Sequence, residues 1–188
     1  MKTELPPHLA TRLINSGPCV LVSCAHGGKD SVFTVSWHMP VSIVPPMIGL
    51  TCVKNNLSHS LISESREFTV NVPEAHLLDA LFNCGKFSAR DTDKFAKFGL
   101  TREKGRKVSA PSVRECAGHL ECRLVAQPAF GDFTVFVGEV VSAYADESKF
   151  KNVWLPHVRL ANHYGDDLFY APGDQLKARL SPDAPVKK

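Results

Sequence analysis

The segment Phe33-Thr-Val-Ser-Trp37-His-Met-Pro-Val-Ser-Ile-Val-Pro-Pro46 carries the clearest structural signal in the chain. Its first half mixes aromatic and β-branched residues with small polar ones, a pattern typical of a half-buried strand. The two prolines at its end stop a strand, because proline cannot donate a ladder hydrogen bond. Similar runs, each bounded by turn residues, predict strands at 19–25, 31–36, 47–53, 67–72, 119–127 and 133–144.

Two further segments have helical character. Residues 57–64 follow Asn55-Asn56, which can cap a helix, and residues 74–84 repeat apolar side chains at helical spacing before Gly85, a natural C-cap. Strands and helices do not alternate regularly, which argues against a doubly wound sheet. The sequence therefore predicts a mostly-β fold with helical insertions, a Greek-key antiparallel barrel. We expect one domain over residues 1–180 and a frayed, proline- and lysine-rich tail at 181–188.

Bulk composition excludes several classes of protein. The chain has 188 residues, of which 44% are hydrophobic and 22% charged, as expected for one globular domain. The net charge of +3 is spread along the chain, without the basic stripe of a nucleic-acid-binding protein. No apolar run approaches the roughly 20 residues of a membrane-spanning helix. An acidic residue and two prolines lie in the N-terminal stretch, where a signal peptide would need an unbroken apolar run. We therefore expect a cytoplasmic protein with no membrane partner.

The six cysteines (Cys19, Cys24, Cys52, Cys84, Cys116 and Cys122) favour buried free thiols, because nothing in the chain implies export and most lie in apolar surroundings. Cys116, His119 and Cys122 could suggest a structural zinc domain. In an extended strand these three side chains do not share a face, and no fourth ligand is near. We predict no metal site. The chain also lacks the glycine-rich signatures of Rossmann and P-loop nucleotide sites.

Five groups of residues, in a fixed order, resemble one family. The segment 33–46 comes first, followed by Ser58-His-Ser-Leu-Ile62 with Glu67-Phe-Thr-Val-Asn-Val-Pro73. Cys84-Gly-Lys-Phe-Ser-Ala-Arg-Asp-Thr-Asp-Lys-Phe95 with Phe98-Gly-Leu-Thr101 is next. Gly131-Asp132 with Phe136-Val-Gly-Glu-Val140, and then His163-Tyr-Gly-Asp-Asp-Leu-Phe-Tyr170, complete the series. Together these motifs resemble the flavin reductase-like, FMN-binding split β-barrel family, and the flavoredoxins in particular.

The resemblance implies a homodimeric split barrel that holds FMN at the edge of the subunit interface, with the flavin along residues 34–39. The FMN phosphate would lie where a strand ends and a helix begins, because free backbone N–H groups and the helix dipole favour an anion there. The candidate cofactor-binding set is Thr34, Val35, Ser36, Trp37, Met39, Cys52, Lys54, Asn56, His59, Ser60, Ser88, Arg90, Asp93 and Lys94. Without the family pattern, Arg90, Asp91, Asp93 and Lys94 would read as charged pairs on a solvated surface.

The expected function is that of an FMN-dependent oxidoreductase, either a flavin reductase or a flavoredoxin-like electron carrier. No catalytic acid or base is assigned, because the redox chemistry belongs to the flavin. The alternative is a flavin-binding sensor or store without turnover. FMN is favoured over FAD, since no further nucleotide signature is visible. Phe133 stands where many flavin reductases of this family have a histidine on the nicotinamide side, and Ala89 where the loop usually has glycine. The first departure favours a protein electron partner over NAD(P)H.

Overall fold

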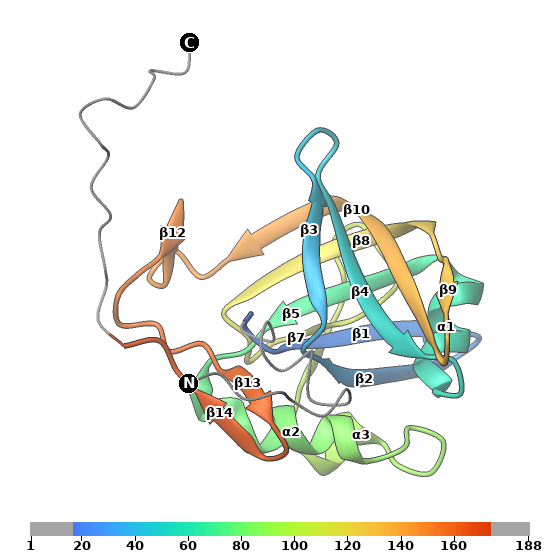
Figure 1. Ribbon diagram of the computed structural model, residues 1–188, viewed down its shortest axis with the longest axis horizontal. Helices are drawn as coiled ribbons and strands as arrows, with labels where there is room; N and C mark the ends of the chain where they lie inside the picture. Colours follow the sequence, from blue (N-terminus) through green and yellow to red (C-terminus); the bar gives the residue numbers. More distant parts are fainter. Residues whose placement is uncertain (1–16, 174–188) are drawn as a thin grey trace, which may run out of the picture.

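A computed structural model describes residues 17–173 and shows a curled, wholly antiparallel sheet (Figure 1). Its main path runs in the order β2-β1-β5-β8-β10-β4-β3, and β9 pairs with β10. The strands are β1 (Val20–His26), β2 (Lys29–Val35), β3 (His38–Ser42), β4 (Met47–Val53), β5 (Glu67–Val72), β8 (Gly118–Ala126), β9 (Ala129–Phe130) and β10 (Phe133–Ala145). The prediction of a mostly-β antiparallel barrel with helical insertions is confirmed.

The core consists of two hydrophobic clusters, one on each face of β1. Val20, Val22 and Cys24 belong to the cluster inside the curled sheet, with Phe68 and Phe136. Leu21 of the same strand and Cys19, which directly precedes it, belong to a second cluster under the helices. Because side chains alternate along a strand, burial on both faces explains why this run is apolar throughout.

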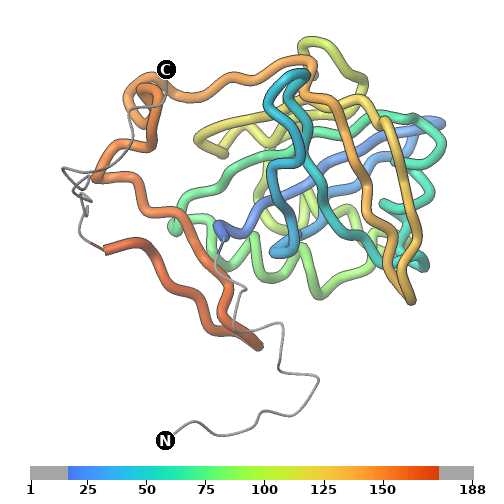
Figure 2. The backbone as a smooth tube through the Cα atoms, turned by 45° about the horizontal axis from the view of Figure 1, so that its top comes forward, coloured from blue at the N-terminus to red at the C-terminus, as the bar shows by residue number. Residues whose placement is uncertain are grey.

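Helices and short hairpins cover the outside of the barrel. They are α1 (Leu57–Ser65), the 3₁₀ turn η2 (Ala75–Leu77), α2 (Leu78–Lys86), α3 (Lys94–Lys97), β6 (Arg102–Glu103) with β7 (Ser112–Val113), β11 (Phe150–Lys151) with β12 (Val153–Trp154), and β13 (Asn162–Gly165) with β14 (Leu168–Tyr170). After β10 the chain leaves the barrel as an arm and returns at β13 and β14 beside α2 (Figures 1 and 2). There Phe169 meets Phe82 edge to face at 6.1 Å, which joins the C-terminal hairpin to α2.

The local predictions hold for the long elements and fail in some details. Each of the six predicted strands is present within two residues of its predicted ends. Asn56 is the N-cap residue of α1, although its side chain makes no capping hydrogen bond. The predicted C-cap at Gly85 is wrong, because α2 continues through it to Lys86. A Cβ at position 85 would lie 3.2 Å from the Cβ of Thr34. The absence of a side chain at Gly85 therefore allows α2 to pack closely against β2.

The cysteine prediction is confirmed, since all six thiols are free and buried. Cys122 faces the inner cluster, whereas His119 points to the other face of β8 and hydrogen-bonds Asn71 Oδ1 at 2.9 Å. Within residues 17–173 no group of three or more His, Cys, Asp or Glu side chains is placed to hold a metal. No helix of this described part is long and apolar enough to cross a membrane. The predicted tail at 181–188 and the domain limit at 180 lie outside the described residues.

Candidate functional site

Three hollows run in sequence along one side of the molecule and share walls. The first, of about 430 Å³, is lined by Phe33, Thr34, Ser36, Trp37, Thr51, Cys52, Val53, Asn56, Phe133, His163 and Gly165. The second, of about 90 Å³, is lined by Phe33, Thr34, Asn55, Asn56, Leu57, Ser58, Cys84, Gly85, Phe87, Ser88, Ala89 and Lys94. The third, of about 590 Å³, is lined by Lys29, Asp30, Ser31, Leu57, Ala89, Arg90, Asp91, Thr92, Asp93, Lys94, Phe95 and Arg102. Because neighbouring hollows share residues, we call the three together the trough.

The first hollow has an aromatic wall. The rings of Trp37 and Phe133 lie 5.4 Å apart, and Trp37 remains 43% exposed. The Trp37 carbonyl accepts the backbone N–H of Thr51 at 3.0 Å, which fixes the segment after β2 against β4. Burial raises the pKa of the Cys52 thiol to about 12, so this side chain stays a neutral thiol at ordinary pH. The wall suits a flat, largely apolar ring system.

The second hollow lies where α1 begins and α2 passes close to β2. Asn56 joins it to the first hollow, and Leu57 and Ser58, the first two residues of α1, also line it. The Thr34 hydroxyl donates to the Leu81 carbonyl, which fixes β2 to α2 on the other side. Ser88 Oγ accepts the backbone N–H of Arg90 at 3.1 Å. The hollow is narrow and polar, which suits a chain of hydroxyl groups.

Lys94 stands between the second and third hollows as a buried cation. Only 5% of its surface is exposed, and its Nζ donates to the Cys84 carbonyl at 2.9 Å. Desolvation by burial lowers the pKa of this ammonium. Lys94 is the first residue of α3, and Asp93 caps that helix by accepting the Ala96 N–H at 3.2 Å. Buried charges are costly unless paired, so an ammonium in this position is suited to an anionic ligand.

The trough brings together nine of the fourteen predicted cofactor-binding residues: Thr34, Ser36, Trp37, Cys52, Asn56, Ser88, Arg90, Asp93 and Lys94. The other five do not line it: Val35, Met39, Lys54, His59 and Ser60. The Val35 side chain is in the core, and Met39 lies exposed on β3.

Lys54 and His59 have partners nearby. Lys54 Nζ donates to the Gly131 carbonyl at 2.6 Å, and His59 Nε2 lies 2.8 Å from Thr134 Oγ1. Desolvation, and then the charge of Lys54, lower the pKa of His59, which favours a neutral imidazole. Binding of a cofactor by the fourteen residues stays a prediction.

Sequence reasoning did not assign several trough residues to the site. His163 and Gly165 reach the first hollow from β13, more than a hundred residues after Trp37. Lys29 and Arg102 reach the third hollow from β2 and β6. His163 and Gly165 lie in a segment that was recognised as a motif, whereas Lys29 and Arg102 lie outside the predicted strands and motifs. No local pattern indicates that these residues meet.

Comparison with known proteins gives the trough its context. The family described as flavin reductase like domain matches residues 12–171. The chain belongs to this family. Flavoredoxin of Desulfovibrio vulgaris (Miyazaki F) has the same fold, with a TM-score of 0.85 and 26% identity over 98% of this chain and 100% of that one. The predicted split barrel is thus confirmed, and this flavin reductase-like chain is an oxidoreductase of a flavin-binding family.

Two curated proteins are similar to this chain in sequence. An uncharacterized protein of Archaeoglobus fulgidus is 39% identical over 113 residues, which are 60% of this chain and span 64% of that protein's length. The reductase component of the FADH(2)-dependent resorcinol hydroxylase of Rhizobium sp. (strain MTP-10005) is 32% identical over 134 residues, 69% of this chain and 70% of that protein.

Proposed function

We propose that this flavin reductase-like protein binds one FMN per subunit in the trough and transfers electrons through it. The observation that carries the proposal is the order of environments along the trough. An aromatic wall at Trp37 and Phe133 is followed by a narrow polar passage at Thr34 and Asn56, and then by the buried cation Lys94. A flavin mononucleotide has the same order of chemistry, with a flat ring system, a hydroxylated chain and a phosphate dianion.

Different residues of the trough would bind different parts of the cofactor. Trp37 and Phe133 would hold the ring system, while Lys94 and the first N–H groups of α1 would hold the phosphate. Bound FMN supplies hydride and electron transfer, and the protein supplies binding, orientation and electrostatics. The neutral thiol of Cys52 fits this division, because a thiolate beside the ring would be a competing nucleophile.

Among flavin-dependent activities we favour an electron carrier that exchanges electrons with another protein. Phe133 lines the first hollow, and its side chain offers only ring contacts, so it cannot hydrogen-bond a nicotinamide amide. The Rhizobium relative is the reductase component of a hydroxylase, which supports a protein or flavin acceptor here as well. Neither that relative nor the flavoredoxin supports the alternative of a sensor or store.

We also propose that the protein is a homodimer in the cytoplasm. The β3–β4 hairpin projects from the barrel (Figure 1), and at its tip Ile43 and Val44 are 89% and 88% exposed. Exposed apolar side chains at a projecting hairpin tip mark a surface that a partner can cover, and two-fold pairing of identical chains would cover them. Sedimentation should give twice the 20.6 kDa chain mass at micromolar concentration, and a single-chain species would contradict the dimer. Six free thiols fit a reducing compartment.

The proposal is tested by purifying the protein and recording its absorbance spectrum. We expect a yellow protein with one FMN per chain that bleaches on anaerobic reduction. If the protein is colourless, apoprotein titrated with FMN should quench flavin fluorescence with one-to-one stoichiometry. A colourless protein that gives no quenching would refute FMN binding, and bound FMN that no reductant bleaches would leave only the storage function.

A further inference from the structure

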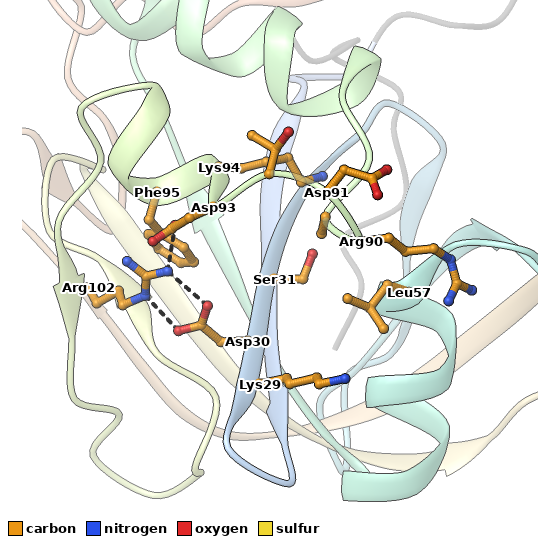
Figure 3. Close-up of a pocket in the computed structure, with 12 residues that line it drawn as sticks. Lys29, Asp30, Ser31, Leu57, Arg90, Asp91, Asp93, Lys94, Phe95 and Arg102 are labelled. Carbon is orange, nitrogen blue, oxygen red and sulfur yellow. Dashed lines mark hydrogen bonds and ion pairs between the residues drawn. The ribbon is translucent and has the colours of Figure 1, made fainter.

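The first hollow of the trough has no permanent charge in its wall. Its lining residues, all from the described part of the chain, include no lysine, arginine, aspartate or glutamate. The basic residues of the trough lie at its other end, where Figure 3 shows Arg90, Lys94 and Arg102 around the third hollow. The part of the trough that suits a flat ring system is therefore the part without a fixed positive charge.

Two side chains of this wall are titratable, those of Cys52 and His163. Burial raises the pKa of the Cys52 thiol to about 12, so this thiol stays neutral. Histidine is the residue type whose ordinary titration falls in the physiological range, and its protonated form is a cation. His163 is therefore the one residue of this wall that can carry a positive charge.

Contacts with its own hairpin hold His163 at the hollow. Its Nε2 lies 3.2 Å from the Asp166 carbonyl oxygen, and its ring centre lies 4.9 Å from that of Phe169. Phe169 in turn meets Phe82 of α2, which joins the hairpin to the body of the protein. Because a carbonyl oxygen can only accept, Nε2 carries a hydrogen, and Nδ1 is the atom that gains or loses the proton.

Other charged or titratable residues lie on the elements around His163, but none of them lines the first hollow. They are Asp166 and Asp167 in its own turn, Tyr164 and Tyr170 on the hairpin, His38 on β3, Lys54 after β4, Asp132 before β10, Lys29 and Asp30 on β2, and Asp79 and Lys86 on α2. His38 is the other imidazole among them. Its Nε2 lies 2.6 Å from the carbonyl oxygen of Pro18, which pairs with Asn162 next to His163.

We propose that His163 takes up a proton when the flavin bound in the first hollow accepts electrons. This inference rests on the proposed function for the place of the ring system beside Trp37 and Phe133. Electrons that enter the ring bring negative charge into a wall without a cation, and a nearby negative charge favours the protonated form of an imidazole. A donor protein supplies two electrons, and the solvent supplies two protons. One proton on the ring cancels one negative charge, and the N–H bond formed at His163 Nδ1 offsets the other.

The test follows the imidazole itself by NMR. FMN-loaded protein with carbon-labelled histidine is titrated across the neutral pH range, once oxidised and once reduced anaerobically with dithionite. His163→Gln and His157→Gln identify the two signals, and His157 is the control because it is exposed and lies outside the trough. Reduction should raise the proton affinity of His163 about tenfold, which moves the midpoint of its titration upward by about one pH unit, and should not change that of His157. If His163→Gln does not fold, the wild-type signal is assigned through its backbone instead.

The reduction potential of bound FMN gives a second measurement. By linkage, a tenfold gain in proton affinity on reduction makes reduction tenfold more favourable while His163 is protonated, which is about 30 mV for a two-electron couple. His163→Gln should therefore lower the potential by about 30 mV at acidic pH, and the difference should disappear as pH rises through the titration of His163. His157→Gln should match the wild type at every pH.

Two results would overturn the inference. One is a His163 midpoint that is the same in the oxidised and reduced protein, and the other is a proton taken up by His38 instead. Failure of the wild-type protein to bind FMN would refute the proposed function rather than the role of His163.

Discussion

Lys94 offers the most direct test of where the FMN phosphate lies. Replacing it with methionine keeps an unbranched side chain only one atom shorter and removes its charge. The ammonium has three N–H donors, of which one goes to the Cys84 carbonyl at 2.9 Å, and the side chain is 5% exposed. Water therefore screens little of its interaction with a ligand. A hydrogen bond to a charged group is worth about 1.5–3 kcal/mol, which corresponds to a loss of about 10- to 150-fold in affinity.

The matched ligand is riboflavin, which has the same ring and chain but no phosphate. Lys94→Met should therefore weaken FMN about 10- to 150-fold and riboflavin less than threefold, as measured by fluorescence quenching of titrated apoprotein. Lys104→Met is the control, because Lys104 is exposed and does not line the trough. Equal losses for FMN and riboflavin, or no loss for either, would show that Lys94 does not contact the phosphate.

Protein stability must stay nearly constant for this comparison to be meaningful. The variant loses the hydrogen bond to Cys84, which costs about 1–3 kcal/mol, but it no longer buries a charge, and the two effects oppose each other. Burial lowers the pKa of the Lys94 ammonium in the empty site, and a phosphate dianion would raise it again. FMN binding by the wild type should thus weaken as alkaline pH deprotonates Lys94, and binding by Lys94→Met should not.

Three other predictions follow from single residues. In anaerobic stopped flow, NADH should reduce the bound flavin more slowly than an ordinary turnover rate of about tens per second. The variant Phe133→His should accelerate this reduction. Fast reduction of the wild type would instead indicate a flavin reductase. Gly138→Ala should lower the free energy of unfolding by about 1–3 kcal/mol in denaturant titrations, because the new Cβ would lie 2.5 Å from Phe68 Cζ. The control Gly17→Ala, whose Cβ would have no atom within 4 Å, should leave it unchanged. Equal changes in the two variants would contradict the packing argument. The hydrogen bond from Arg102 lowers the pKa of Asp93, so Asp93→Asn, which can still cap α3, should lose up to about 1 kcal/mol at neutral pH. The stabilisation by Asp93 is complete above its unfolded pKa of about 3.9 and disappears as pH falls through its lower folded value, so a difference between wild type and variant that persists at more acidic pH would refute the ion pair.

The fold could be predicted from sequence where the local signal and the packing agree. β10 is such an element, since its threonine, valine and phenylalanine residues fit a pleated surface that the structure buries. β3 was not predicted, because Pro40 lies inside it and its side chains are mostly exposed, so neither propensity nor alternation marks it. Gly85 was misread because a glycine near a helix end has two explanations, a left-handed cap or a close approach. Only the position of Thr34, fifty-one residues earlier, decides between them.

The site was predictable only where its residues belong to motifs. Thr34, Asn56 and Lys94 lie in separate segments whose order resembles a family, and the trough brings them together because β2, α1 and α3 meet at one side of the barrel. Arg102 shows the opposite case. Its two acidic partners lie on β2 and at the start of α3, and its stacking partner Phe95 is fixed only when α3 packs on the barrel. Sequence can identify an arginine, but its fixed orientation comes from three tertiary contacts. A motif therefore identifies segments that resemble a flavin-binding family, whereas the other residues of the trough come together only through the way the loops pack.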